Sequence, residues 1–227
     1  MTAAAVRSAP AQPPAPGLFG STISLAGEIV VWLLVSLAAS VAIEWVGMVF
    51  WWPDQASAHS RDLFLAEREH LATATREAAL LINPAQVSDR AVSWFHDTVW
   101  RDTGALGFVE GMSGTLAEFG VALVNTTLLF VTRLTILALA TPTFIIFGLV
   151  GLADGLIERD LRRWGGGRES GYVFHLATRF IKPAVVWTWV IYLALPFTLN
   201  PAFIIVPFAL MFAYAIRVSA ASFKKHL

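Results

Sequence analysis

The sequence predicts an all-helical integral membrane protein with four transmembrane helices, both termini in the cytoplasm and a small helical domain in the periplasm. Hydrophobic residues make up 56% of the 227 residues and charged residues only 14%, against about 25% charged in an ordinary soluble domain. The mean hydropathy is +0.64. Long runs at 29–52, 119–153 and 183–216 hold few charges or none. These runs indicate a multi-pass integral membrane protein.

The charge balance and the cysteine content exclude several classes of function. The chain has 16 basic and 16 acidic side chains, so no overall field attracts nucleic acid or an acidic partner. It has no cysteine, which excludes disulfides, thiolate metal sites and cysteine nucleophiles. The remaining information lies in the individual segments.

The N-terminal segment predicts a disordered cytoplasmic tail at 1–27 and a first transmembrane helix at 28–52. The tail begins with an Ala- and Pro-rich stretch that holds one charge and few large apolar residues, too few to bury a core. A bilayer core about 30 Å thick needs roughly 20 apolar residues as helix, and the run at 29–52 is interrupted only by Glu44. A cleaved signal peptide ending at the Ser-Val-Ala of 40–42 is the alternative. Glu28 just before the run, and its continuation to Trp52, favour retention.

Residues 53–118 predict the helical periplasmic domain. One narrow helix face is formed by Phe64, Leu71, Thr75, Ala78 and Ile82. Asn83 and Pro84 end this helix, and a second helix starts at Ser88 as its N-cap. That helix places Ala91, Phe95 and Val99 on one face. Two such helices make a thin core, so we expect them to pack on the membrane or on a partner.

The next apolar runs predict three further crossings. Residues 119–153 carry one charge, Arg133, and as a single helix they would reach about 52 Å, too long for one crossing. We therefore expect 134–153 to cross, with Arg133 near one interface and the preceding turns as an N-terminal extension. Two prolines in "LPFTLNP" at 195–201 predict a turn, which divides the last run into helices at 183–199 and 200–223. A basic cytoplasmic tail follows at 224–227.

Lys and Arg near the ends of the spans set the orientation. Residues 154–182 hold six basic side chains in 29 residues, whereas 53–118 hold five in 66 residues beside ten acids. We therefore expect 154–182 in the cytoplasm and 53–118 outside, which is the periplasm in a Gram-negative host.

The loop at 154–182 is the candidate partner-docking surface. Ile157, Leu161 and Trp164 have helical spacing before a run of three glycines, and Tyr172 begins a second such pattern after it. This is typical of two amphipathic helices that lie in the membrane interface, with arginines toward anionic lipids. The candidate docking residues are Asp154, Arg159, Asp160, Arg162, Arg163, Gly165, Gly166, Gly167, Arg168, Glu169, Ser170 and Gly171.

Three other interpretations of this loop are weaker. A phosphate-binding loop needs a lysine and a preceding strand, and the glycine run has neither. Six basic and four acidic residues leave a charge of only +2, so no direct nucleic-acid binding is expected. Ser170 with His175 as a hydrolytic pair has no identifiable third group.

Charges inside the apolar runs are functional candidates, because a charge in hydrocarbon is costly. Glu44 and Arg133 both fall toward the outer end of their spans, so we expect them to form an intramembrane ion pair. The alternative is a small transporter or channel in which Glu44 carries a proton, but the run at 183–216, which holds most of the last two spans, offers no further charged group for a relay. His59, His70 and His96 show no metal-binding spacing.

Four segments together carry a family resemblance: "IEWVGMVFWWP" at 43–53, "GLADGLIERDLRRWGGGRESGYVFH" at 151–175, "YLALP" at 192–196 and the closing "SAASFKKHL". In order and spacing they resemble multi-spanning membrane proteins encoded in integrating conjugative elements of proteobacteria. The resemblance implies an inner-membrane component of a conjugative DNA-transfer apparatus of type IV secretion type. It implies no enzymatic activity, cofactor, metal or catalytic residue. The implied partners are membrane lipids and other conjugation or secretion membrane proteins, with the coupling ATPase among them.

Overall fold

The protein is built of helices throughout the part of the chain that the structure describes. The computed structural model describes residues 18–77, 83–165 and 171–223. These ranges form α1 (Leu18–Phe50), α2 (Ser57–Glu77), α3 (Pro84–Phe95), the π-helix η1 (His96–Arg101), α4 (Ala105–Glu110), α5 (Thr115–Trp164), α6 (Gly171–Ala194) and α7 (Ala202–Ser222), with no strand among them. The all-helical class is therefore confirmed for these ranges.

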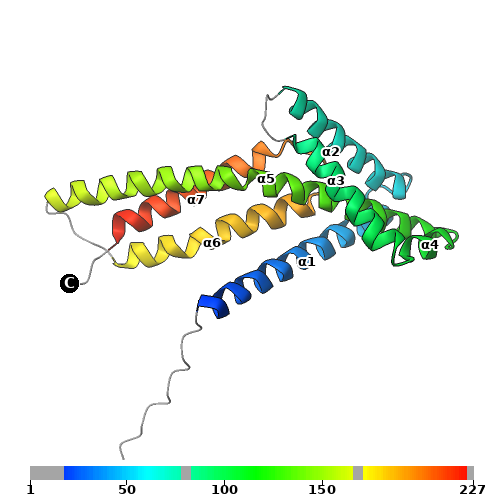
Figure 1. Ribbon diagram of the computed structural model, residues 1–227, viewed down its shortest axis with the longest axis horizontal. Helices are drawn as coiled ribbons and strands as arrows, with labels where there is room; N and C mark the ends of the chain where they lie inside the picture. The colour runs from blue at the N-terminus through cyan, green and yellow to red at the C-terminus, as the bar shows by residue number, and fades with distance from the viewer. Residues whose placement is uncertain (1–17, 78–82, 166–170, 224–227) are drawn as a thin grey trace, which may run out of the picture.

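The helices fall into a long bundle and a group at one end of it. In Figure 1, α1, α5, α6 and α7 run roughly along the long axis, and α2, α3 and α4 gather at one end. Helix α5 packs against α7 for much of its length, and α7 also packs against α6. Helices α2 and α3 pack on the N-terminal half of α5, and α1 lies against α6 and α5.

Three of the described helices are long and apolar enough to cross a membrane: Gly27–Phe50 within α1, Thr115–Trp164 and Ala202–Ser222. The remaining expected crossing, 183–199, was predicted as the third in chain order, and the helix found there has other bounds. Helix α6 starts at Gly171, continues through Pro183 and ends at Ala194. Its first half carries Arg179 and Lys182, and α6 is not among the three helices that are long and apolar enough to cross. A crossing by α6, which would make four in all, remains a prediction.

Helix α5 also departs from the predicted division at residue 153. It is continuous over 50 residues, a length of about 75 Å, and so contains the predicted crossing, its predicted N-terminal extension and the first part of the predicted loop. The charged residues after 153 did not end the helix, because Glu and Arg are good helix formers. Pro142 lies inside it, as prolines can in membrane helices where neighbouring groups satisfy the freed carbonyl.

The close approach of α5 to α7 depends on glycines. Gly151 and Gly155 are both buried on the face of α5 toward α7. A Cβ atom on Gly151 would clash with the carbonyl oxygen of Ala213, and one on Gly155 would clash with that of Arg217. Small residues let membrane helices pack backbone to backbone in this way. Any side chain at either glycine would force the two helices apart.

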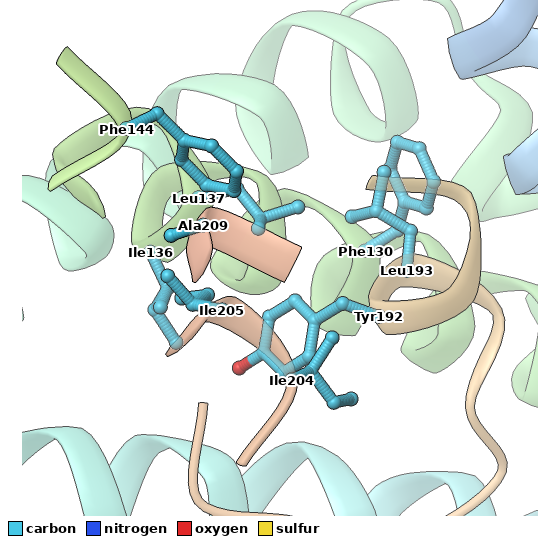
Figure 2. Packing of buried hydrophobic residues seen from close by; sticks show 9 residues of the cluster. All are labelled: Phe130, Ile136, Leu137, Phe144, Tyr192, Leu193, Ile204, Ile205 and Ala209. Carbon is cyan, nitrogen blue, oxygen red and sulfur yellow. The ribbon is translucent and has the colours of Figure 1, made fainter. Parts of the chain in front are cut away.

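The central apolar core lies where α5, α6 and α7 meet. Figure 2 shows its buried members, which come from all three helices: Phe130, Ile136, Leu137, Phe144, Tyr192, Leu193, Ile204, Ile205 and Ala209. Leu193 and Ala209 are fully buried. This cluster fixes the end of α6 and the start of α7 against the middle of α5.

The end group of helices completes its core with α5 itself. The buried members are Phe64 from α2, Val92 from α3, Trp100 from η1, Val109 from α4, and Val124, Leu128 and Leu129 from α5. The Trp100 indole donates a hydrogen bond of 3.0 Å to the Thr127 hydroxyl of α5. The thin core expected for 53–118 is thus covered by the next helix of the same chain.

Two details of this end group differ from the prediction. The second helix begins five residues earlier, because Asn83 is the N-cap, accepting from the Gln86 amide, and Pro84 takes the first turn. Ser88 is instead buried inside α3. Val99 is exposed, because the π-helix η1 adds a residue to the turn and turns Trp100 inward. Phe64 and Phe95 do face the core as expected, while Ala78 and Ile82 lie outside the described residues.

The starts of α1 and α2 complete the fold. Helix α1 begins at Leu18, inside the 1–27 segment expected to be disordered, because the apolar sequence already starts there; residues 1–17 lie outside the described part. The first turn of α2 is capped from α5, where the Glu118 carboxylate accepts hydrogen bonds from the Ser57 hydroxyl and backbone amide. These bonds lower the pKa of Glu118.

Candidate functional site

A buried polar cluster lies at the junction of the end group and the bundle, with Arg133 of α5 at its centre. The Arg133 side chain is fully buried. Its guanidinium donates to two carbonyl oxygens of the α6–α7 connection, that of Leu195 at 2.5 Å and that of Phe197 at 2.9 Å. These carbonyls are free because α6 ends at Ala194 and Pro196 follows. Arg133 therefore holds the α6–α7 connection against α5.

Glu67 of α2 supplies the negative charge in this cluster. Its carboxylate is fully buried and lies 3.5 Å from the Arg133 guanidinium. Tyr192 of α6 donates a hydrogen bond of 2.7 Å to the same carboxylate, and the Arg133 Cζ lies 5.6 Å from the centre of the Tyr192 ring. A buried charge pair is tolerated only when further hydrogen bonds satisfy it. The cluster thus joins α2, α5 and α6 through groups that depend on one another.

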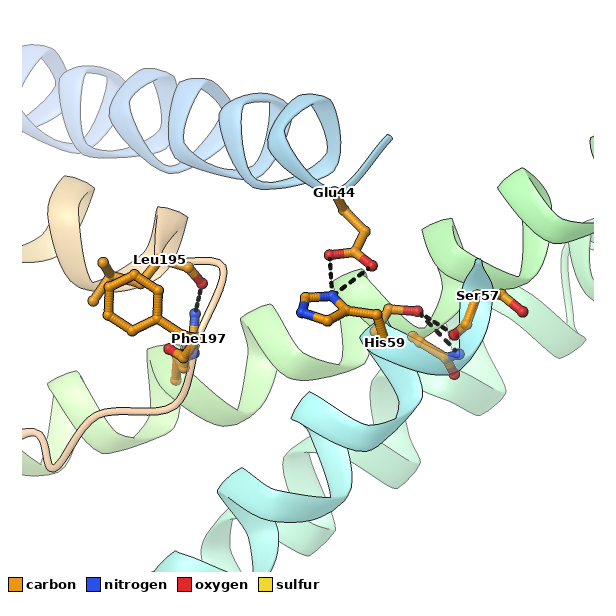
Figure 3. Close-up of polar contacts among 8 residues, drawn as sticks. Glu44, Ser57, His59, Leu195 and Phe197 are labelled. Atoms are coloured by element: carbon orange, nitrogen blue, oxygen red, sulfur yellow. Dashed lines mark hydrogen bonds and ion pairs between the residues drawn. The ribbon is translucent and has the colours of Figure 1, made fainter. Parts of the chain in front are cut away.

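Glu44 of α1 pairs with a different helix. The His59 Nδ1 of α2 lies 3.1 Å from both oxygens of the Glu44 carboxylate (Figure 3). The Glu44 side chain is only 5% exposed, and the Trp52 ring stacks on the His59 ring with centroids 3.9 Å apart. This contact joins the end of α1 to the start of α2.

The structure therefore replaces the predicted Glu44–Arg133 pair with two separate pairs. Both residues do lie near the same end of the bundle, but α2 supplies His59 to one and Glu67 to the other. The signal for Glu67 was present in the sequence. It stands three residues after Phe64 and four before Leu71, and so on the apolar face of α2, where an acid needs a partner.

Within the described residues, the predicted docking loop is divided between an internally paired face and a free one. On the paired face, Arg217 of α7 forms ion pairs with Asp154 at 2.6 Å and Glu158 at 3.1 Å. Arg162 donates 2.7 Å to the carbonyl oxygen of Ala221. Arg159 lies over the Phe223 ring, 5.6 Å from its centre. Arg159 and Arg162 thus hold the end of α5 to α7.

The free face of this end is formed by Asp160, Arg163 and Trp164, which line a surface hollow of about 380 Å³. Trp164 is 91% exposed, and Leu161 beside it is 67% exposed. Gly165 ends the helix, and Gly171 begins α6. The remaining docking candidates, Gly166, Gly167, Arg168, Glu169 and Ser170, lie outside the described residues.

Metal chemistry finds no support in the described ranges, where no three His, Asp or Glu side chains are close enough to share an ion. His59 is engaged by Glu44, and His96 lies 3.4 Å from the neighbouring Asp97. The polar groups brought together here pair helices with one another.

These features define a class: an all-helical protein whose apolar helices suggest a membrane location, with buried charges paired between helices. Residues 51–224 match the DtrJ-like family, described as "IncC plasmid conjugative DNA transfer protein DtrJ-like". The chain belongs to this family, and the family supports a role in conjugation. No curated protein and no solved structure matches the chain. The conjugation-associated part of the predicted resemblance is therefore confirmed.

Proposed function

We propose that this protein is a non-enzymatic scaffold of the inner-membrane part of a conjugative DNA-transfer apparatus, of type IV secretion type, carried by an integrating conjugative element. It crosses the membrane four times with both termini in the cytoplasm. Its role is to hold a periplasmic helical domain and a cytoplasmic docking surface in fixed relation. Membership of a conjugative DNA-transfer family supports the setting, and the geometry of α5 supports the scaffold role.

The observation that carries the proposal is the continuity of α5. Its 50 residues rise about 75 Å, more than twice the bilayer core of about 30 Å. Its first turns complete the core of the end group, and its last turns pair with α7. One helix thus joins the domain on one side of the membrane to the surface on the other.

The course of α6 and α7 supports four crossings. Phe174 near the start of α6 packs on Phe223 at the end of α7, with ring centres 5.7 Å apart, close to the last turns of α5. At its other end α6 places Tyr192 against Glu67 of α2. Both α6 and α7 therefore extend from the C-terminal end of α5 to the end group of α2, α3 and α4, as α5 does.

The free face at the end of α5 is the docking surface in this proposal. Arg163 and Trp164 project from the most basic stretch of the chain, which the positive-inside rule assigns to the cytoplasm. An exposed Trp beside an Arg is the composition favoured at the centres of protein interfaces. The partner class is a cytoplasmic or membrane subunit of the same transfer machine, with the coupling ATPase as the first candidate.

The test compares wild type with the double variant Arg163→Gln, Trp164→Ala in donor cells. The protein is purified in detergent, the co-purifying subunits are identified, and the frequency of DNA transfer is counted. Wild type should recover secretion-channel or coupling-ATPase subunits, and the variant should lose them together with DNA transfer while accumulating normally. Arg159 and Arg162 are left intact, because they hold α7.

The matched control is Arg90→Gln, Trp94→Ala on α3, which removes the same two residue types from exposed positions at the other end of the molecule. It should keep the cytoplasmic partner. Recovery of no transfer subunit by wild type, or equal loss in both variants, contradicts the docking surface.

A further inference from the structure

An apolar groove runs between α1 and α6 and is used by none of the contacts described above. Its volume is about 300 Å³, at the lower end of the size of small-molecule sites. The walls are Ile29, Trp32 and Leu33 of α1 and Val186, Trp189 and Val190 of α6. Because α1 and α6 both lie in the proposed membrane region, this groove opens to lipid.

One end of the groove carries two opposite charges. The Lys182 ammonium and the Glu28 carboxylate both line it and lie 2.6 Å apart. The Lys182 side chain is 60% exposed and that of Glu28 is 40% exposed. Both charges therefore remain accessible at the mouth, while the interior is apolar.

The length of the groove matches one leaflet. From Glu28 at the mouth to Ser36 at the inner end, α1 rises about 12 Å. Half of a bilayer core is about 15 Å. A groove that is charged at the interface and apolar through most of one leaflet has the polarity profile of a phospholipid, headgroup at the mouth and acyl chain within.

The size of the groove argues against a helix as its occupant. A helix with its side chains is about 10–12 Å across, and a second copy of this chain would need a far larger surface than this groove offers. An extended acyl chain is narrow enough to lie between α1 and α6.

We propose that this groove binds one acyl chain of a phospholipid whose headgroup combines a phosphate with a primary ammonium. The phosphate contacts Lys182 and the ammonium donates hydrogen bonds to Glu28, so two charge-assisted contacts replace the internal pair. A quaternary ammonium has no N–H to donate, and a headgroup with a phosphate alone leaves Glu28 facing negative charge. The inference rests on the membrane placement of α1 and α6 and not on any docking partner.

The experiment uses the full chain purified in detergent and an equal mixture of phosphoethanolamine, phosphocholine and phosphoglycerol lipids with the same acyl chains. Native mass spectrometry counts the lipids retained per chain. We expect one retained lipid, with the phosphoethanolamine form favoured roughly tenfold over each of the others.

Two variants separate the acyl and headgroup contacts. Val186→Trp fills the groove and should abolish retention, whereas Val35→Trp, a matched change at an exposed position of α1 outside the groove, should leave it intact. Glu28→Gln should keep a bound lipid but lose the preference for the primary ammonium over the quaternary one.

Equal retention of the three lipids by wild type overturns the proposal, as does wild-type retention in Val186→Trp. A dimer mass in place of bound lipid also overturns it. If Val186→Trp does not fold, Glu28→Gln decides: an unchanged headgroup preference in that variant contradicts the assigned contacts.

Discussion

Two buried carboxylates, Glu44 and Glu67, anchor α2 to the rest of the molecule through different partners. Glu44 pairs with a histidine whose ring is covered by Trp52. Glu67 pairs with Arg133 and with the Tyr192 hydroxyl. The two carboxylates differ in their exposure to water. Glu44 is 5% exposed, whereas loss of Arg133 would leave the Glu67 carboxylate unpaired with no exposure at all.

Removing Arg133 should be strongly destabilising. In Arg133→Met the Glu67 carboxylate stays buried without its cation, and the two carbonyls of the α6–α7 connection lose their donor. A broken buried pair costs about 3–5 kcal/mol, which should appear as a lower unfolding temperature in detergent and reduced membrane accumulation. The double variant Arg133→Met, Glu67→Gln should be less destabilised than the single one.

A charge exchange between positions 44 and 133 distinguishes the predicted Glu44–Arg133 pair from the two pairs that the structure shows. The exchange Glu44→Arg with Arg133→Glu should not restore stability. The carboxylate introduced at position 133 would face the carboxylate of Glu67, and the guanidinium introduced at position 44 would face His59. Full restoration would show that residues 44 and 133 interact directly.

Glu44 and His59 should behave as one unit if their contact is structural. Glu44→Gln and His59→Gln should each lower the unfolding temperature, and the double variant should lose less than the sum of the two, with a coupling of about 0.5–3 kcal/mol for groups in contact. DNA transfer should fall only as far as accumulation falls. If Glu44→Gln abolishes transfer at normal stability while His59→Gln does not, the transporter or channel alternative gains its first support.

At this scale the sequence predicted that Glu44 and Arg133 need partners, and at which end, but not which residues the partners are. Depth along a span follows from residue number, since each residue adds about 1.5 Å. The partner depends on how α2 is placed against the bundle, which local pattern does not determine. Glu67 on an apolar face was the available clue.

At the scale of helices, the contact between α5 and α7 depends on positions that have no side chain. The stretch "GLVGLADG" at 148–155 places three glycines on the face of α5 toward α7. Charged pairs continue the same contact beyond the glycines, where Arg217 meets Asp154 and Glu158. The end of α5 is therefore fixed first by close packing and then by ion pairs.

Gly151→Ala should destabilise the protein although alanine is the better helix former. The new Cβ would meet the backbone of Ala213, and such overpacking costs about 1–3 kcal/mol. Gly107→Ala on α4 is the matched control, because nothing lies within 4 Å of its added Cβ; it should gain up to about 1 kcal/mol. Unfolding temperatures in detergent measure both, and equal changes of the same sign would contradict the packing argument.

The extent of the helices was only partly predictable. The apolar runs identified α1, α5 and α7, because about 20 uncharged residues are a strong signal. The continuity of α5 was missed because the charged stretch after residue 153 was expected to form a separate helix in the membrane interface, whereas here Arg162 and Asp154 find partners on α7. The start of α3 was missed because Asn83 was taken as a stop, although an Asn before Pro serves equally as an N-cap.

For the molecule as a whole, the proposed topology can be measured without background, because the chain has no cysteine. Single cysteines at Arg90 and Asn200 should react with a membrane-impermeant maleimide added from the periplasmic side. A cysteine at Arg163 should react only after the inner membrane is opened. The cysteine at position 200, in the α6–α7 connection, tests whether α6 crosses the membrane. Protection of this cysteine from the periplasmic reagent would contradict the crossing.

The helical class and the family setting followed from composition and motif order, both of which are properties of the sequence alone. The arrangement of the helices in space did not follow from the sequence. The polar contacts that position the end group join residues far apart in the chain, such as Glu67 and Tyr192. The candidate docking face was found in part. Docking by the loop stays a prediction, and which of its arginines face outward depends on where α7 lies.

The unbroken course of α5 also imposes a rule on how this protein can change its length. A helix completes one turn in about 3.6 residues, so a single inserted or deleted residue in α5 would rotate everything before it by about 100° relative to everything after it. The end group of α2, α3 and α4 would then point in a new direction, while the glycines of α5 at 148–155 would still face α7. Changes of about seven or eleven residues, close to two or three full turns, would preserve the relative orientation. In functional variants of this protein, insertions and deletions are therefore expected in the loops. Helix α5 is expected to keep the rotational relation between its two ends.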